Sequence, residues 1–498
     1  MNLEGNNLEE NISLPYDFAK VHRILAYLKE SKLFVIAEKK LSAGMYQELS
    51  RFLRSDFYLE VCSPKDFDHL LTQHYSAEEN NSSLGADLSE NFDLQSYANT
   101  LAPTEDLLSG ANDAPIIKLI NGVLSQAIKA RASDIHFEPY EDNFIIRYRI
   151  DGILQEVLTH DSRLSAPIIS RLKIIARLDI AERRKPQDGR VSLSLGTNKI
   201  DVRVSTLPSS YGERVVLRLL DKKAAQINIS DLGLPESILA SYKTALTFSE
   251  GMILVTGPTG SGKTTTLYSG LCHVSDSSQN ILTVEDPIEY TLPGIGQTQV
   301  HAKAGYDFAS GLRSILRQDP DIVMVGEIRD IETAKIAIQA SLTGHLVLST
   351  VHTNSAIGAI ARLRDMGIES YLLASSIRMV VSQRLVRRLC SSCKIETLAP
   401  ESIQQKFLLE SNSPIFKPNG CKECSHSGFK GRVALAECIN VTDELKTLIH
   451  EESSERALAK CAFKNTLSID ASATKLLLEG ITSYKELLKV QSHHDANI

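Results

Sequence analysis

The chain has 498 residues, of which 43% are hydrophobic and 23% are charged, and its net charge is -7 with a pI of about 6.0. This length predicts two to four domains, and the composition is typical of a soluble globular protein. The acidic balance argues against a dedicated duplex-DNA binder, and no apolar run approaches the roughly 18 residues that a membrane-spanning helix needs. The polar N-terminus (MNLEGNNLEE) does not resemble a secretory signal peptide, so we expect a cytosolic protein.

Residues 1–75 are predicted to form a small α/β domain. In "YDFAKVHRILAYLKES" the apolar residues Phe18, Val21, Leu25 and Leu28 recur at helical spacing, which predicts a helix over residues 16–31. A strand-like "LFVIAE" and a second helical stretch, "AGMYQELSRFL", follow. Nothing in this domain looks catalytic, and we interpret it as a partner-docking domain.

Residues 76–112 are predicted to be an acidic flexible linker. No Lys or Arg occurs between Asp66 and Pro115, and the segment is rich in Ser, Asn and acidic residues. Such a composition cannot bury enough apolar surface to fold alone. An acidic docking site is the alternative to a solvated tether.

Residues 113–233 are predicted to form a second domain of the α+β type. A helix is expected to carry Ile116, Leu119, Ile120 and Val123 on one face. The stretches "DIHFEP" and "FIIRYRIDG" indicate strands, as do two alternating runs around a Gly-Thr-Asn turn and a final "RVVLRLL".

Residues 234–498 show a different pattern, in which helical stretches alternate with short buried strands. The strands are "MILVT", "NILTVE", "DIVMVGE" and "HLVLSTVH". This pattern predicts a mostly parallel sheet covered by helices, and the tail after residue 440 is predicted to be helical.

A phosphate-binding loop follows the first of these strands. The run fits G-x-x-x-x-G-K-[ST] and precedes a predicted helix, which is the context that this motif requires. The backbone N–H groups and the helix N-terminus favour phosphate, Lys263 reaches the outer phosphates, and the Thr264 hydroxyl suits Mg²⁺. We assign nucleotide binding to Gly257, Pro258, Thr259, Gly260, Ser261, Gly262, Lys263, Thr264 and Thr265.

Carboxylates end two further predicted strands. Glu327 follows "DIVMVG" and fits a water-mediated contact to Mg²⁺, although it could simply end a strand. The stretch "TVEDPIEY" supplies Glu285, Asp286 and Glu289, one of which we expect to orient the water that attacks ATP. Spacing alone does not say which of the three it is.

Two histidines bracket the strand in "TGHLVLSTVHTN". His345 precedes it and His352 follows it. Lone histidines are more often structural, but this placement in a nucleotide domain predicts a γ-phosphate sensor, with His352 the nearer candidate.

Four cysteines form two pairs, Cys390-Ser-Ser-Cys393 and Cys421-Lys-Glu-Cys424, with 27 residues between the pairs. Two-residue loops let both thiolates of a pair face one ion, and four sulfurs satisfy tetrahedral Zn²⁺ with no open position. We therefore predict a structural zinc site in an insert at 388–432. Four unligated thiols or a redox pair are the alternatives.

The neighbouring "RLVRRLC" is predicted to be a solvated face or a docking site for an acidic partner.

Together these motifs identify a family resemblance. The stretches "GPTGSGKTTT", "TVEDPIEY", "LRQDPDIVMVGEIRD" and "TGHLVLSTVHTN" resemble the Walker A, Asp, Walker B and His boxes of the secretion traffic ATPases. "LDIAERRKPQDGR" and "DVRVSTLPSSYGERVVLRLLD" are similar to the second N-terminal domain of that family. "LPYDFAK" and the length of the chain resemble its type II secretion members.

The resemblance implies a RecA-like P-loop ATPase domain preceded by a PAS-like α+β domain and a small N-terminal α/β domain. It also implies a homo-hexameric motor that uses ATP and Mg²⁺ and powers pseudopilus assembly for type II secretion. Such a motor is peripheral on the cytoplasmic face of the inner membrane. Its N-terminal domain binds the cytoplasmic domains of inner-membrane secretion proteins, and it makes no direct contact with nucleic acid.

The resemblance also assigns roles to single residues. Glu289 matches the catalytic glutamate and Glu327 the Mg²⁺-linked glutamate. Arg203 and Arg218 match arginines that reach the phosphates from the second domain, and a guanidinium there would neutralise charge developing on the γ-phosphate. Arg313 and Arg317, which precede the Walker B strand, are candidates to assist them. An ordinary surface charge is the alternative for each arginine.

Three other functions stay open at this stage. A type IV pilus assembly ATPase is the near rival within the same class. A DNA-translocating ATPase belongs to another class, and the acidic balance and the lack of an aromatic-basic stripe argue against it. A nucleotide-gated scaffold without turnover would not need the catalytic residues that the sequence carries.

Overall fold

The computed structural model describes Leu14, Phe67 and residues 22–29, 32–53, 55–63, 93–100, 114–195, 198–221, 228–276 and 278–491. The chain divides into two compact units, Met1–Phe92 with Ser194–Asn198 and Asp93–Leu193 with Lys199–Ile498. Within the described ranges, no helix combines the length and the apolar character that a membrane crossing requires.

In the described residues of the first unit, a three-stranded sheet is accompanied by helix α2 (Ala43–Leu53). The central strand β2 (Lys32–Ala37) pairs antiparallel with β1 (Ile24–Lys29) and parallel with β3 (Tyr58–Val61). Buried apolar side chains of β1, β2 and α2 form its core. The helix α2 spans the same residues as the second predicted helix, so the predicted α/β character of this domain is confirmed.

The helix predicted over residues 16–31 is wrong for Ile24–Lys29, which form strand β1. Phe18 and Val21 lie outside the described residues. Four consecutive β1 side chains, from Ile24 to Tyr27, are buried. A strand covered on both faces produces a continuous apolar run, and in such a run an accidental helical spacing cannot be told from a real one.

The second domain is a six-stranded sheet with strand order β6-β5-β4-β9-β8-β7. Helix α5 (Ala114–Lys129) buries the predicted apolar face, and α6 (Ser165–Ile175) contacts β4 and β9. The predicted strands are present, and β6 is an additional one. The strands are β4 (Asp134–Pro139), β5 (Asn143–Ile150), β6 (Ile153–Asp161), β7 (Gln187–Leu195), β8 (Asn198–Ser209) and β9 (Gly212–Asp221).

A short helix, α4 (Leu94–Thr100), lies inside the segment predicted as a flexible linker. Leu94 and Ala98 are buried, the Tyr97 hydroxyl donates to the carbonyl of Pro115 (3.4 Å), and Lys118 lies over the Tyr97 ring. The linker prediction is therefore wrong for residues 94–100, where a few apolar side chains suffice because α5 and β6 supply the surface that buries them.

The C-terminal domain is built on a seven-stranded sheet with strand order β12-β11-β13-β14-β10-β15-β18. Every described pairing in it is parallel except that of β15 with β18. The four predicted strands correspond to β10, β11, β13 and β14. The strands are β10 (Gly251–Thr256), β11 (Ile281–Glu285), β12 (Gly296–Gln299), β13 (Ile322–Val325), β14 (Leu346–Val351), β15 (Ile377–Leu389) and β18 (Phe429–Asn440).

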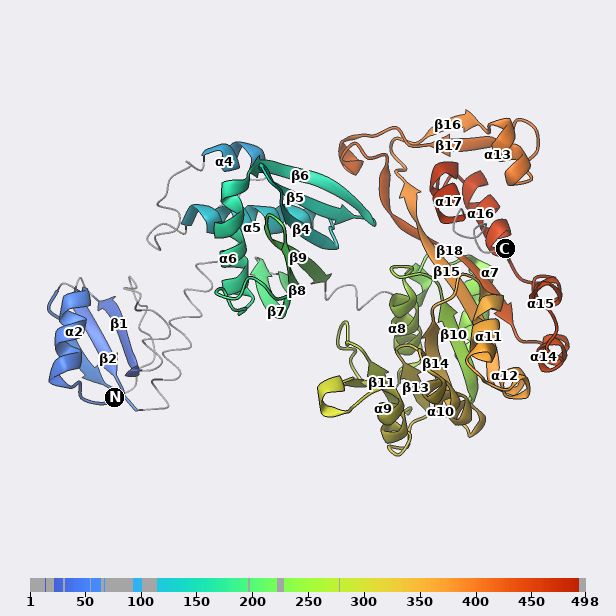
Figure 1. The fold of residues 1–498 in the computed structure, drawn as a ribbon, viewed down its shortest axis with the longest axis horizontal. Coiled ribbons are helices and arrows are strands. Elements are labelled where there is room, and N and C mark those ends of the chain that lie inside the picture. The colour runs from blue at the N-terminus through green and yellow to red at the C-terminus, as the bar shows by residue number, and fades with distance from the viewer. Residues whose placement is uncertain are drawn as a thin grey trace. The chain divides into compact units, whose positions relative to one another are not determined.

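Helices cover both faces of this sheet (Figure 1). On one face α7 (Glu236–Ala245) and α8 (Lys263–Val274) pack against Ile253, Val255 and their neighbours. On the other face Met252 and Leu254 pack against a second set of helices. These are α9 (Phe308–Ile315), α10 (Ile331–Leu342), α11 (Ala356–Asp365), α12 (Ser370–Ser376), α14 (Asp443–His450) and α15 (Glu455–Ala462).

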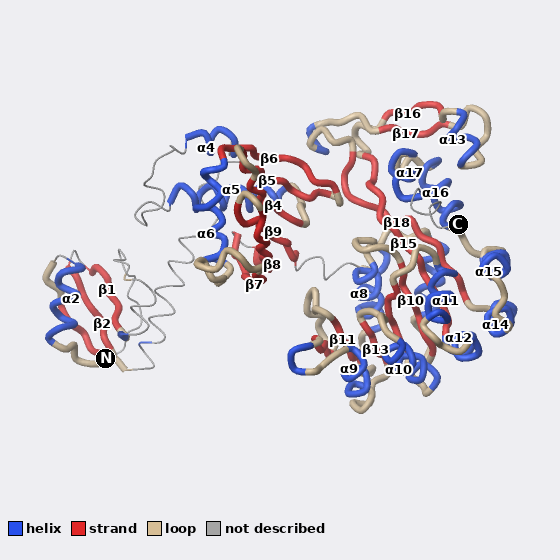
Figure 2. The backbone as a smooth tube through the Cα atoms, viewed as in Figure 1, coloured by secondary structure: helices blue, strands red, loops and turns tan. Residues whose placement is uncertain are grey.

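The long strands β15 and β18 lead from the sheet to the cysteine insert (Figure 2). The insert holds the hairpin β16 (Ile395–Leu398) and β17 (Pro414–Lys417) with helix α13 (Glu401–Lys406). Its apolar side chains share a core with α16 (Ile469–Leu478) and α17 (Tyr484–Gln491). The helical tail is thus as predicted, and the predicted domain boundaries at 75, 112 and 233 stay predictions.

Candidate nucleotide-binding site

The phosphate loop connects the end of β10 to the start of α8. Gly257, Gly260 and Gly262 have φ angles of 144°, 78° and 87°, in the left-handed region that side chains disfavour. A Cβ on Gly257 would also collide with the carbonyl oxygen of Gln383. The glycines therefore let the chain wind into α8 so that its N-terminal amides can face an anion.

Lys263 begins α8 and reaches back over the loop. Its Nζ donates to the carbonyl oxygens of Gly257 (2.9 Å) and Pro258 (3.1 Å). Burial lowers the pKa of Lys263, an effect that the nearby Glu327 carboxylate partly offsets. Thr264 is exposed and Thr265 is half-buried in the same helical turn. A phosphate group entering the loop would take over the hydrogen bonds that Lys263 now makes to the backbone.

Glu327 lies just beyond the end of β13, near Lys263 and His352. The His352 Nε2 is 3.2 Å from one Glu327 oxygen, and Arg329 pairs with the other. The Glu327 side chain is only 12% exposed, whereas that of His352 is 50% exposed. The structure thus brings the predicted metal-linked acid, the predicted sensor and the loop lysine together.

The acidic cluster that the sequence left unresolved separates into two environments. Glu285 is buried and accepts hydrogen bonds from the Tyr268 hydroxyl, the Thr283 hydroxyl (2.6 Å) and Gln297 Nε2 (2.9 Å). Glu289 is 31% exposed and faces Arg203. Asp286 is exposed. The geometry suits Glu289 to work on a bound ligand, because the Glu285 carboxylate is fully engaged inside the fold.

The two arginines of the second domain differ in what they contact. They face each other across the β8–β9 pair. Arg203 Nη2 lies 3.9 Å from Glu289 Oε2 and, among the described residues, is a buried atom with no hydrogen-bond partner. Arg218 is 55% exposed and its Nε lies 3.0 Å from Asp134 Oδ1. Only Arg203 is brought to the acidic cluster.

The remaining predicted candidates have structural partners. His345 Nδ1 lies 3.0 Å from the carbonyl oxygen of Ala340, before β14 begins. Arg313 pairs with Glu332 on α10, and Arg317 donates to the carbonyl oxygen of Arg313 (2.9 Å). These contacts favour the interpretation of the three as structural residues.

Sequence reasoning missed one residue that touches the phosphate loop, Gln383 on β15. Its side-chain amide bonds to Thr266 and Ser261, which lie 117 and 122 positions away along the chain. No local pattern could have found a contact between residues so far apart in sequence.

The four paired cysteines cluster at the base of the insert, with all sulfur atoms within 4.8 Å of one another. Three of the sulfur pairs are 3.7–3.8 Å apart. A tetrahedral ion with metal–sulfur bonds of about 2.3 Å requires sulfur–sulfur distances of about 3.8 Å. Although burial raises the pKa of Cys424, N–H bonds from Cys421 and Gly428 lower it to about 6. The cluster therefore has the dimensions and the charge-stabilising donors of a metal site.

The basic run beside the first cysteine pair is largely engaged within the fold. Arg384 is buried and donates to the carbonyl oxygens of Val490 and Asn354, and Arg387 pairs with Glu486 (2.7 Å). The predicted solvated or docking face is wrong for these two residues, because they tie β15 to α17 and to the loop after β14. Arg388 is exposed.

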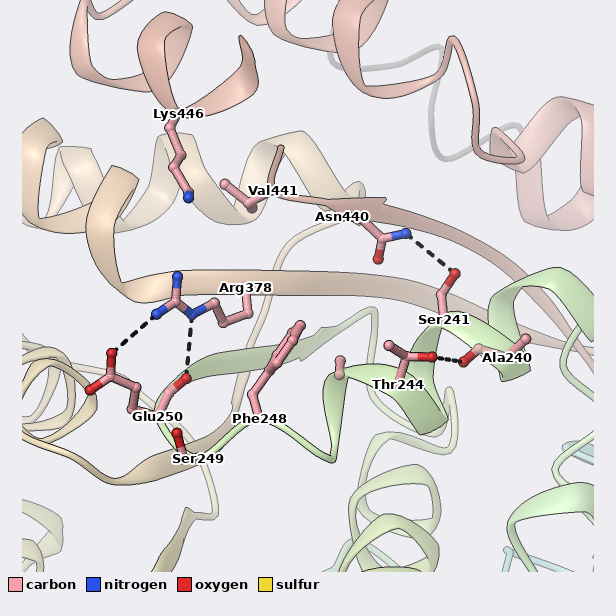
Figure 3. A pocket seen from close by; sticks show the side chains of 11 residues that line it. Ala240, Ser241, Thr244, Phe248, Ser249, Glu250, Arg378, Asn440, Val441 and Lys446 are labelled. Atoms are coloured by element: carbon pink, nitrogen blue, oxygen red, sulfur yellow. Dashed lines mark hydrogen bonds and ion pairs between the residues drawn. The ribbon is translucent and has the colours of Figure 1, made fainter. Parts of the chain in front are cut away.

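A cavity of about 600 Å³ lies at the other end of β10 and is not part of this site (Figure 3). It is lined by α7, by Phe248 and Glu250, and by Arg378 and Lys446. Arg378 donates to the carbonyl oxygen of Glu250 (3.3 Å). Because the phosphate loop follows the opposite end of the strand, the two places are separate.

Comparison with known proteins gives two family matches. The sequence model described as "Type II/IV secretion system protein" matches residues 109–489. A second model, which describes a domain of "GSPII protein E", matches residues 13–75. Together these two models cover most of the chain.

Individual relatives are similar over nearly their whole length. "Type II secretion system protein E" of Pseudomonas aeruginosa is 48% identical over 480 residues, and "Type II secretion system ATPase E" of Vibrio cholerae is 47% identical over 486 residues. Each alignment covers 96% of both chains.

Solved structures show the fold. The ATPase DotB of Legionella pneumophila has a TM-score of 0.56 at 22% identity and covers 75% of this chain and 95% of its own. The pilus retraction motor PilT with bound ADP has a TM-score of 0.53 at 24% identity and covers 74% and 95%. The predicted RecA-like class is confirmed by this likeness.

Proposed function

Since this chain belongs to the type II/IV secretion system protein family, we propose that it hydrolyses ATP to power export through a type II secretion system. The observation that carries the proposal is a phosphate loop whose Lys263 lies near Glu327 and His352, with Glu289 beside Arg203, in a chain that aligns over 96% of its length with type II secretion proteins. The likeness to a pilus retraction motor concerns the fold alone, so it does not favour the pilus alternative.

Each residue of the site has a proposed role. The loop amides and Lys263 bind the β- and γ-phosphates, and Glu289 orients the attacking water. His352 senses the γ-phosphate through its contact with Glu327. Arg203, which already lies beside Glu289, neutralises the charge that develops as the γ-phosphoryl group leaves. We also assign Arg218 to the nucleotide phosphates, although in this structure it pairs with Asp134.

Magnesium is the ion that this donor set suits. The Thr264 hydroxyl and the Glu327 carboxylate are oxygen ligands, which Mg²⁺ prefers, directly or through water. When bound, the ion would neutralise phosphate charge. In the structure the Glu327 carboxylate contacts Arg329 and His352, so a bound ion would displace one of these contacts or reach the carboxylate through water.

We assign Zn²⁺ to the cysteine cluster, as a structural ion held by Cys390, Cys393, Cys421 and Cys424. The sulfur spacing supports tetrahedral coordination, and four sulfur ligands leave no open position for catalysis. The backbone N–H bonds to Cys393 and Cys424 would stabilise the thiolates.

The proposed assembly is a homo-hexamer on the cytoplasmic face of the inner membrane. The N-terminal domain, which matches the domain model of type II protein E, is proposed to dock on cytoplasmic domains of inner-membrane secretion proteins. Contact with the membrane would then be indirect or peripheral, and no direct contact with nucleic acid is expected.

The test compares the parent chain with Lys263→Ala and with Lys335→Ala, an exposed lysine on α10 that serves as a matched control. The parent and the control should turn over ATP and restore export in a host that lacks its own motor. Lys263→Ala should lose at least roughly 100-fold in turnover and restore nothing. Normal export by Lys263→Ala, or ATP turnover that requires DNA, would contradict the proposal.

A further inference from the structure

Gln383 occupies the middle of β15, beside the strand that delivers the phosphate loop. In the β10–β15 pairing, Ser382 lies opposite Thr256, the last residue before the loop. The backbone of Gln383 is therefore beside Gly257, and the residue is only 2% exposed. A buried amide in this position needs partners for both of its ends.

Both ends of that amide bond to the phosphate loop and its helix. Gln383 Nε2 donates to the carbonyl oxygen of Ser261 (2.9 Å), and Oε1 accepts from the Thr266 hydroxyl (2.9 Å). Ser261 and Thr266 are themselves buried, so water does not replace either bond. The amide thus clamps the end of the loop and the first turn of α8 to one strand.

The clamp has a directional consequence for the backbone. The carbonyl of Ser261 and the N–H of Gly262 belong to one trans peptide group, so they point in opposite directions. Holding the carbonyl against Gln383 turns the N–H of Gly262 to the opposite side. Gly262, with a φ of 87°, is a residue that could otherwise rotate readily.

We infer that Gln383 is a positioning residue that aims the phosphate-loop amide of Gly262 at the nucleotide phosphates, an inference that rests on the proposed nucleotide site. Its effect is on binding. If the Gly262 amide points away from the phosphates, its hydrogen bond is lost in the ATP complex and in the transition state equally. Such a loss raises KM more than it lowers kcat.

The experiment uses the full chain with Gln383→Leu. The matched control is Gln404→Leu, because Gln404 Nε2 also donates to a backbone carbonyl, that of Ala399 (2.7 Å), but lies in the cysteine insert. Dissociation constants for fluorescent ATP and ADP, kcat at saturating ATP, and the melting temperature with and without nucleotide are measured for each. Thr266→Val, which removes the other partner, and the double variant are measured in the same way.

We expect Gln383→Leu to raise the dissociation constant for ATP at least roughly tenfold and to leave kcat within about threefold. Its melting temperature without nucleotide should fall below that of Gln404→Leu, because two buried groups lose their partners, and the increase on adding ATP should be smaller than in the parent. Thr266→Val should weaken binding in the same direction, and the double variant should lose less than the sum of the two.

Equal ATP affinity in the parent and in Gln383→Leu would overturn the inference and leave the proposed function standing. A loss of kcat without a change in affinity would also overturn it. If Gln383→Leu does not fold, unchanged affinity in Thr266→Val overturns the inference instead. A parent protein that binds no ATP at all would refute the proposed function itself.

Discussion

Two glutamates of the same acidic stretch are expected to fail in different ways when each is replaced by glutamine. Glu285 sits inside the fold with three side-chain donors, whereas Glu289 is partly exposed beside Arg203. Glu289→Gln should fold and bind ATP but not hydrolyse it. Glu285→Gln should lose stability first, because an amide cannot accept from all three donors at once.

The structure sets the size of each effect. A hydrogen bond to a charged group contributes about 1.5–3 kcal/mol, and three that share one carboxylate are not additive, so Glu285→Gln should cost about 3–5 kcal/mol. For a domain of this size that is a melting temperature lower by roughly 10 °C. The partly exposed Glu289–Arg203 pair, with 3.9 Å between its charged atoms, contributes about 1 kcal/mol, while loss of a catalytic base lowers turnover by about 10²- to 10⁴-fold.

The assay measures thermal unfolding, affinity for ATP and steady-state phosphate release on both variants and the parent. We expect Glu289→Gln to lose turnover but keep its stability, and Glu285→Gln to lose stability. Parent-like turnover by Glu289→Gln would transfer the catalytic role to another acid. A parent-like melting temperature for Glu285→Gln would refute the buried-carboxylate argument.

Three further outcomes follow from other parts of the chain. Arg203→Ala should lower turnover at least ~100-fold. Arg163→Ala, which removes an exposed ion pair with Asp161, should not change phosphate release. Cys393→Ser should reduce the zinc content of the purified protein from one ion per chain to none, as measured by elemental analysis. The pKa of Glu486, which burial raises but bonds from Arg387 and Lys489 lower, falls from 4.5 to about 2. Because a depressed carboxyl pKa stabilises the fold above the unfolded value, α17 should lose protection from amide exchange between pH about 4.5 and 2, and Glu486→Gln should flatten that pH dependence.

Sequence alone was enough wherever the signal is local. The strand before the phosphate loop, the glycines and Lys263 lie within one short stretch, and the motif implies its own geometry. The two cysteine pairs likewise carry their spacing with them. The sequence also placed Glu327 and His352 at strand ends, and parallel strands bring such ends to one edge of a sheet.

Where structure was needed, the deciding contact is distant in sequence or hidden by burial. The apolar run from Ile24 to Tyr27 fits either a helix or a strand, and its pairing with β2 decides it. The choice between Glu285 and Glu289 depends on donors from α8 and β12. The role of Gln383 depends on which strand lies beside β10.

The way the insert is buried has a consequence for shortened forms of the chain. Its side chains form one apolar cluster with the last two helices, and the cluster includes Ala399, Ile403, Phe407, Ile415, Leu476, Leu477 and Leu487. The Lys394 Nζ also donates to the carbonyl oxygen of Gly480 (2.8 Å), which ties the loop after the first cysteine pair to the end of α16. Cutting the chain before residue 469 would expose the apolar side chains of the cysteine insert to solvent. Removing the insert would in turn expose the apolar faces of α16 and α17. The two must be kept or discarded as one piece, a rule that any trimming of this protein for crystallisation or assembly studies has to respect.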